Sequence, residues 1–217
     1  MSVPPPTLET TALVIIDMQR DFLDPRGYIA QTGVDVQGLR EIIPNVRRLL
    51  HAARDTGVHV IHTREGHRPD LSDLPAVKAR RAAGSGAPIG STGPLGRLLV
   101  RGELGHSIIP ELEPLPTEPV IDKPGFGAFY ATDLEQLLRV AGIRTLVISG
   151  VTTDICVHST LREAVDRGFE CITAGDACAA GDPAIHQAML ACVDGEGGIL
   201  GRVASTESIV TSWTQRS

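Results

Sequence analysis

The sequence has few aromatic residues and no excess of positive charge. Phenylalanine, tryptophan and tyrosine make up 3% of the 217 residues, which leaves little for a surface that stacks nucleic-acid bases. Lysine and arginine number 20 against 26 aspartates and glutamates, giving a net charge of −6. Because binding to a phosphate backbone needs a basic surface, the composition excludes nucleic acid as the main partner.

Long apolar runs and targeting signals are also missing. No apolar run approaches the roughly 18 residues of a transmembrane helix, so we expect no membrane partner. The N-terminal string MSVPPPTLETT lacks the basic and apolar parts of a signal peptide. We therefore expect a soluble, cytoplasmic protein.

Cofactor and metal signatures are absent as well. No G-x-G-x-x-G motif follows the first predicted strand, so nothing supports a dinucleotide, and we expect no cofactor. His59 and His62 lie three residues apart in a predicted strand and face opposite sides of it, which prevents them from holding one metal ion. We expect no metal site.

The four cysteines form no C-x-x-C pair, and in a cytoplasmic protein each is expected to be a buried free thiol. They all lie in the last third of the chain, at Cys156, Cys171, Cys178 and Cys192. Cys171 is in a predicted strand and Cys192 in a predicted helix, so both are expected to fill the core. Cys156 has a different setting, which is treated below.

Apolar runs alternate with amphipathic stretches along the whole chain. With 217 residues, 42% of them hydrophobic, the length suits one domain spanning residues 1–217. Strands are predicted at 12–16, 58–62, 120–122, 145–149, 170–173 and 201–205, and helices at 44–57, from 132, at 154–167 and from 182. This alternation predicts an α/β fold with three layers (α/β/α), in which helices cover both faces of a mostly parallel sheet. Residues 64–118 show weak periodicity, and a long irregular segment of this kind is usually functional.

In parallel sheets, ligands bind beyond the carboxyl ends of the strands, so the residues there are candidates for function. Asp17 directly follows the first predicted strand, where an acid is either a capping group or a catalytic carboxylate. Lys123 follows the third, where Pro124 and Gly125 form a turn. The alternative for Lys123 is an ordinary surface lysine paired with Asp122.

Cys156 follows the fourth predicted strand, in the string SGVTTDICVHST, and falls in the first turn of the next helix. Unsatisfied N–H groups and the helix dipole at that position favour a thiolate, which is the nucleophilic form. The alternative is a small apolar residue that packs the helix on the sheet. If Asp17, Lys123 and Cys156 converge, the acid can take the thiol proton and the lysine can support the charge, which is the equipment for acyl transfer from an amide.

Several neighbours of these motifs are further candidates. Gln19 could orient Asp17 or the substrate, although a solvated amide is the commoner case. Phe22 and Phe126 each flank a triad motif, and each either lines the substrate pocket or packs in the core. The charged residues around Glu65, in the string REGHRPD, form either a salt-bridged loop or part of the pocket entrance.

These residues resemble the isochorismatase-like cysteine hydrolases over nearly the whole chain, and the family's Asp-Lys-Cys triad falls on Asp17, Lys123 and Cys156. The string SGVTTDICV is the most specific part of the resemblance. The resemblance implies a cis peptide bond between Val151 and Thr152. It also implies an oxyanion hole formed by the N–H groups of Thr152 and Cys156.

A closer resemblance, carried by HTREGHRPDLSDLPAVK and IDKPGFGAFYATDLE, is to the branch of this family that hydrolyses biuret and triuret. Two positions depart from that branch: Phe126 stands in place of a second lysine, and Glu196 in place of a glutamine. Ionised glutamate only accepts hydrogen bonds, so Glu196 is expected to bind a substrate that presents N–H groups.

The resemblance implies an enzyme that releases ammonia from a small linear ureide, biuret or triuret first, through a covalent acyl-enzyme. The alternatives are a related carboxamide or carbamoyl hydrolase acting on ureidoacrylate, an N-carbamoyl compound or nicotinamide, or a non-catalytic binding module of the same fold. Isochorismatase activity itself is a weak alternative, because the acidic surface does not suit a strongly anionic substrate. The resemblance also implies a homo-oligomer, most often a tetramer.

Overall fold

The computed structural model describes residues 7–215, and its centre is a six-stranded sheet in which every neighbouring pair is parallel. The strands lie in the order β5-β2-β1-β6-β7-β8. Their bounds are β1 Thr11–Ile16, β2 His59–Glu65, β5 Val120–Lys123, β6 Thr145–Val151, β7 Glu170–Ala179 and β8 Arg202–Ala204. A short antiparallel pair, β3 Thr92–Gly93 and β4 Gly96–Arg97, lies apart from the sheet.

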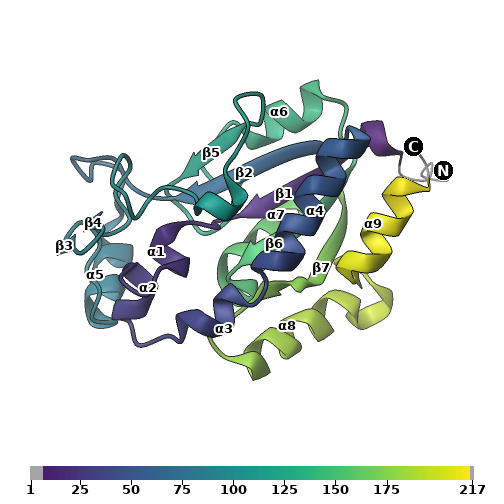
Figure 1. Ribbon diagram of the computed structural model, residues 1–217. Helices are drawn as coiled ribbons and strands as arrows, with labels where there is room; N and C mark the ends of the chain where they lie inside the picture. The colour runs from purple at the N-terminus through teal and green to yellow at the C-terminus, as the bar shows by residue number, and fades with distance from the viewer. Residues whose placement is uncertain (1–6, 216–217) are drawn as a thin grey trace.

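Helices connect the strands and cover the sheet on both faces (Figure 1). The α-helices are α1 Arg20–Leu23, α2 Tyr28–Gln31, α3 Val36–Arg40, α4 Ile43–Thr56, α5 Ala76–Gly84, α6 Leu134–Val140, α7 His158–Asp166, α8 Pro183–Asp194 and α9 Thr206–Thr214. Short helical turns are η1 Leu8–Thr10, η2 Pro110–Leu112, η3 Thr153–Val157 and η4 Gly195–Gly197. The predicted three-layer α/β/α fold with a parallel sheet is confirmed.

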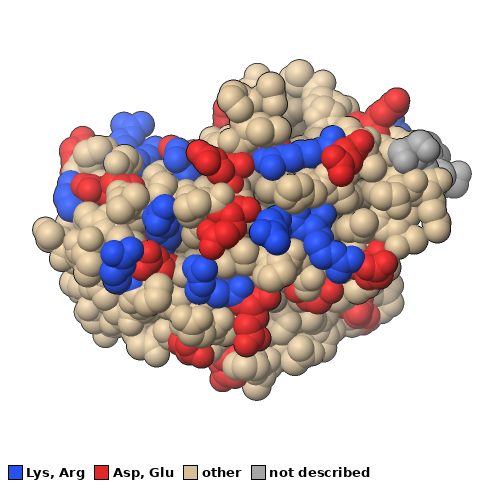
Figure 2. All heavy atoms as spheres, viewed as in Figure 1, with Lys and Arg blue, Asp and Glu red and all other residues tan. Residues whose placement is uncertain are grey.

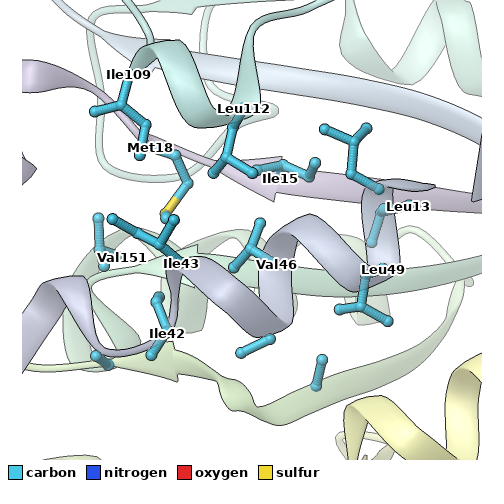
Figure 3. Close-up of a cluster of buried hydrophobic side chains, with 14 of the residues drawn as sticks. Leu13, Ile15, Met18, Ile42, Ile43, Val46, Leu49, Ile109, Leu112 and Val151 are labelled. Carbon is cyan, nitrogen blue, oxygen red and sulfur yellow. The ribbon is translucent and has the colours of Figure 1, made fainter. Parts of the chain in front are cut away.

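Two hydrophobic clusters, one on each face of the sheet, hold the layers together. Leu13 and Ile15 of β1 belong to the cluster under α4 and α9, whereas Val14 and Ile16 belong to the cluster under α6 and α7. Figure 3 shows side chains of α4, including Val46, packed toward those of β1. Because successive side chains of a strand point to opposite faces, a strand buried on both faces must be apolar at every position, as in the run from Ala12.

The long segment at 64–118 contains more regular structure than its sequence predicts. It includes α5, the antiparallel pair and η2, joined by turns. Helix α5 has only Ala82 buried, so its sequence AVKARRAAG carries no apolar stripe. The helices α1, α2, α3 and α9 are likewise absent from the sequence-based prediction. The first three have four or five residues each, too few for a periodic pattern.

Asp21 ties this long segment to the start of the chain. Its carboxylate accepts hydrogen bonds from the backbone N–H of Leu99 at 3.0 Å and of Tyr28 at 3.3 Å. Burial raises the pKa of Asp21 to about 6, although both hydrogen bonds oppose the shift. The folded protein therefore binds this proton more tightly than the unfolded chain, and the stabilising contribution is lost as the pH rises from about 4 through about 6.

We expect Asp21→Asn to remove this pH dependence. A pKa raised from 3.8 to about 6 corresponds to about 3 kcal/mol at most, so the stability difference between wild type and variant should change by up to that amount between pH 4 and pH 7. Urea unfolding at a series of pH values measures it. Asp24→Asn is the matched control and should change in the opposite sense, because the hydrogen bond from Arg26 lowers the pKa of Asp24. Parallel curves for wild type and Asp21→Asn would contradict the expectation.

The surface view in Figure 2 shows acidic and basic side chains interspersed over the face drawn, with no broad patch of one sign. Among residues 7–215, no helix combines the length and apolar character needed to cross a bilayer.

Candidate active site

The polar groups predicted from the strand ends meet at the carboxyl edge of the sheet. Asp17 directly follows β1, Lys123 ends β5, and Cys156 lies in η3 directly after β6. These three strands belong to the run β5-β2-β1-β6 of the parallel sheet, so their carboxyl ends lie at one edge. All three side chains are buried, with 0%, 0% and 4% of their residue surfaces exposed.

Asp17 is held in a fixed orientation. Its backbone adopts a positive φ of 49°, which is uncommon for a residue other than glycine and occurs often at functional sites. Its Oδ1 accepts a hydrogen bond from the Thr63 hydroxyl at 2.6 Å, and its N–H donates to the same hydroxyl oxygen at 3.1 Å. The Oδ2 atom lies 2.7 Å from Nζ of Lys123.

Lys123 uses all of its ammonium protons within the protein. Its Nζ donates to the carbonyl oxygens of Gly125 at 3.0 Å and Phe126 at 2.9 Å, and it pairs with Asp17. Burial opposes the positive charge, but the neighbouring acidic groups, with Asp17 first, raise the pKa of Lys123 above its ordinary value. The acidic neighbours therefore favour the charged form of Lys123.

The thiol of Cys156 faces the acidic groups of this cluster. Its Sγ donates a hydrogen bond to Oε2 of Glu65 at 3.2 Å. Burial raises the pKa of the Cys156 thiol well above its ordinary value, with Lys123 opposing the shift and Asp17 and Glu65 adding to it. The helix N-terminus favours a thiolate, as the sequence predicts, whereas burial and the two carboxylates favour the protonated thiol. A base must remove the proton before the sulfur can attack.

Glu65 also belongs to this cluster, although the sequence did not indicate its central position. It is the last residue of β2, stands opposite Lys123 in the β2–β5 register, and is 3% exposed. Its Oε1 pairs with Nζ of Lys78 at 2.6 Å, and its Oε2 lies 3.7 Å from Nζ of Lys123. Like Lys123, it ends a strand of the parallel sheet, and that position is the signal that could have identified it.

The two carboxylates differ in basicity. Burial raises the pKa of Asp17 above its ordinary value, even though Lys123 and Thr63 oppose the shift. Burial also penalises the charge on Glu65, but there the ammonium groups of Lys123 and Lys78 prevail and lower the pKa. These opposite shifts favour Asp17 over Glu65 as the acceptor for the thiol proton and favour the ionised form of Glu65.

The segment before Cys156 has the backbone features implied by the family resemblance. The peptide bond between Val151 and Thr152 is cis, as that resemblance implies. The turn η3 begins at Thr153 and is π-helical, a geometry that often occurs at functional sites. Gly150, with φ of 117°, lies so close to β1 that a Cβ atom would clash with the Ile16 carbonyl. The assignment of the Thr152 and Cys156 N–H groups to an oxyanion hole stays a prediction.

Gln19 lies next to the cluster, but it neither orients Asp17 or a substrate nor lies in solvent. It is completely buried, and its amide oxygen accepts from the Glu65 N–H at 2.7 Å. Its amide nitrogen donates to the carbonyl oxygens of Glu65 at 3.0 Å and His106 at 3.1 Å. With both amide protons used, Gln19 fixes the end of β2 and cannot donate to Asp17 or to a substrate.

The two phenylalanines have different environments. Phe22 is buried in the core cluster on the α4 side and packs edge-to-face against Tyr28 at 6.2 Å, which is the core role considered for it. Phe126 is 43% exposed, and Nζ of Lys78 lies 4.9 Å from the centre of its ring. Phe126 therefore lies beside the cluster, where it can line the entrance.

Glu196 does not join the cluster within one chain, so its predicted place in the site is wrong for the isolated protomer. It lies in η4, exposed, in the connection between α8 and β8. That connection enters the amino end of β8, and Gly201 within it approaches Cys171 near the start of β7. The cluster lies at the opposite, carboxyl end of the sheet. The resemblance predicted Glu196 in the site, but the direction of β8 puts it at the other end of the sheet.

The other cysteines are free thiols away from the acidic cluster. Cys171 and Cys178 are buried, as predicted, and burial raises the pKa of each to about 12. Cys192 is exposed, so its predicted place in the core is wrong, because α8 buries only Val193.

Asp17, Glu65 and Cys156 are the one group of potential metal ligands among residues 7–215, with ligand atoms within 4.8 Å of one another. Both carboxylates already have a cationic partner. Nζ of Lys123 lies 2.7 Å from Asp17, and Nζ of Lys78 lies 2.6 Å from Glu65. A metal ion there would face two ammonium groups, so this donor set fits proton transfer better than metal binding.

Comparisons with known proteins agree with this geometry. Residues 11–207 match the model of the isochorismatase domain. A ureidoacrylate amidohydrolase (RutB) from Methylorubrum extorquens is 32% identical over 216 residues, covering 94% of this chain and 84% of the relative.

Solved structures with the same fold include two described as cysteine hydrolase and amidase. The cysteine hydrolase from Pseudomonas syringae pv. phaseolicola 1448A has a TM-score of 0.83 and 25% identity, with 100% of both chains covered. The N-carbamoylsarcosine amidase from Thermoplasma acidophilum has a TM-score of 0.70 and 26% identity, covering 91% of this chain and 97% of that one.

Proposed function

Because the chain belongs to the isochorismatase domain family and is a hydrolase acting on amide bonds, we propose that it releases ammonia from a small linear ureide through Cys156. The observation that carries this proposal is the buried cluster in which Asp17 and Lys123 pair at 2.7 Å beside a thiol that needs a base. Nucleophile, base and fixed cation are the parts that covalent hydrolysis of an amide requires.

The first half of the proposed reaction forms the acyl-enzyme. Asp17 takes the proton from Cys156, and the sulfur attacks the substrate carbonyl carbon. The charge that develops on the carbonyl oxygen rests on the N–H groups of Thr152 and Cys156. Asp17 then returns the proton to the leaving nitrogen, the C–N bond breaks, and ammonia departs. Lys123 keeps the charge of the cluster balanced while the proton moves.

The second half restores the thiol. Asp17, ionised again, takes a proton from a water molecule, and the hydroxide attacks the thioester-like carbonyl. The C–S bond breaks, the sulfur recovers its proton from Asp17, and the acid product leaves. For a ureide the acyl-enzyme is a thiocarbamate and the product a carbamic acid.

A ureide attached to a longer chain, of the ureidoacrylate kind, is the substrate class we favour. The RutB relative reported above acts by name on ureidoacrylate, and the solved amidase by name on an N-carbamoyl compound. Biuret and triuret contain the same NH–CO–NH₂ unit, and we rank them second as predicted substrates.

Ammonia release from a substrate panel tests the proposal. We expect ureidoacrylate and N-carbamoyl amino acids to give the highest kcat/KM, biuret and triuret less, and nicotinamide the least. Preference for nicotinamide would overturn the ureide assignment. No ammonia from any of these compounds would favour the alternative of a non-catalytic module with the same fold.

The single domain over residues 1–217, the catalytic roles and the homotetramer also stay predictions.

A further inference from the structure

Glu65 is placed where it can touch a substrate as well as the thiol. Its Oε2 is 3.2 Å from Sγ of Cys156, the atom that attacks the carbonyl. A carbonyl carbon bound at that sulfur therefore brings one of its two flanking groups next to Oε2. Glu65 is not part of the Asp-Lys-Cys triad, and the reaction described above does not use it.

The carboxylate of Glu65 is built to stay charged and fixed. Lys78 pairs with Oε1 at 2.6 Å and itself donates to the Pro124 carbonyl at 2.7 Å. Gln19 binds the Glu65 backbone on both its N–H and its C=O. An ionised carboxylate only accepts hydrogen bonds, so a group seated against Oε2 must be a donor.

Ureides and plain carboxamides differ at that position. Both can present a terminal NH₂, but a ureide carries a second N–H on the other side of its carbonyl, where a carboxamide carries carbon. We propose that Glu65, held by Lys78, binds this second N–H and is the residue that selects ureides over carboxamides. This assignment rests on the function proposed above and identifies the residue that distinguishes between substrates.

The same contact links binding to activation of the nucleophile. In the free protein the thiol proton points at Glu65. A substrate N–H that takes Oε2 displaces this hydrogen bond and leaves the thiol proton to Asp17, the other carboxylate of the cluster. The buried cluster of Asp17, Glu65, Lys78, Lys123 and the thiol is neutral overall, and the transfer from sulfur to Asp17 keeps it so.

A matched pair of substrates tests the selection. N-carbamoyl-β-alanine and glutaramate differ only in NH against CH₂ beside the scissile amide carbonyl. We expect Glu65→Gln to lower the ratio of their kcat/KM values by roughly 10- to 100-fold, the range for losing a hydrogen bond to a charged acceptor. Any difference in intrinsic reactivity between the two compounds cancels, because the ratio of their kcat/KM values is compared between the wild type and the variant. Glu65→Gln with Lys78→Met is the second variant; it removes both charges together and should show the same lowered ratio.

Alkylation of Cys156 by iodoacetamide gives a readout that needs no substrate. The charge of Glu65 helps to raise the pKa of the thiol, so Glu65→Gln should move the midpoint of the pH–rate profile to lower pH. The experiment uses a Cys192→Ser background, because Cys192 is exposed and would react as well. A residue that merely supports the fold would not produce this shift.

The possible results separate the two proposals. An active enzyme whose ratio is unchanged in Glu65→Gln overturns the selective role of Glu65 and leaves the proposed function standing. An unchanged alkylation profile overturns the contact between Glu65 and the thiol. If the wild type hydrolyses neither compound nor any ureide of the panel, the proposed function fails, and the assignment of Glu65 fails with it.

Discussion

Replacing Cys156 with alanine is expected to lower kcat for ammonia release by about 10⁴-fold or more, because no other nucleophile lies in the cluster. The sulfur lies within 4.8 Å of a carboxylate oxygen of Asp17 and of Glu65, and alanine removes only the reacting atom. The fold should tolerate the change, since both residues are small and Cys156 is 4% exposed. Single-turnover and steady-state assays on the best ureide of the panel give the measurement.

Two further cysteine variants make this prediction specific. Cys156→Ser keeps a hydroxyl at the same place, but the higher pKa of an alcohol should leave it nearly as inactive as alanine. Cys192→Ser is the matched control: it alters an exposed thiol on α8 and should retain wild-type activity. Full turnover by Cys156→Ala would end the covalent mechanism.

Lys123→Met is expected to destabilise the protein by about 3–5 kcal/mol, the usual effect of removing one partner from a buried ion pair. Asp17 would then stay buried with the Thr63 hydroxyl as its remaining side-chain partner. The carbonyl oxygens of Gly125 and Phe126 would lose their donor as well. Ammonia release should fall below detection, because the positive charge that favours the ionised form of Asp17 is then gone.

A double variant separates stability from activity. In Asp17→Asn with Lys123→Met both charges are gone, so urea unfolding should show that much of the lost stability returns. Activity should not return, because the base is absent. A Lys123→Met single variant as stable as wild type would show that the ion pair contributes little to the folded state and would contradict the burial argument.

The strands and the order of the layers could be predicted well because their signals are local. The run from Ala12 to Ile16 is apolar at every position and must lie inside a sheet covered on both faces. The short helices before residue 43 and the exposed helix α5 carry no such pattern, and packing against distant segments positions them. Asp21 shows this, since its partners are backbone groups of Tyr28 and Leu99.

The candidate site was predictable in part for the same reason. Asp17 and Lys123 directly follow predicted strands, and Cys156 lies in the first turn of the helix after another. Parallel strands bring such ends together. Phe22, Glu196 and Cys192 had no comparable constraint. Their side chains were assigned by neighbourhood or resemblance, and the structure places Phe22 in the core, Glu196 at the other end of the sheet and Cys192 on the surface.

The sequence by itself determined the alternation of strands and helices, and with it the edge where an acid, an amine and a thiol gather. That information is local, because burial on two faces and strand direction follow from a few consecutive residues. Only the tertiary structure decided in which direction the pKa of the thiol shifts and which second carboxylate the thiol meets. Those properties depend on burial and on Lys78, a cation brought by a helix with no pattern of its own.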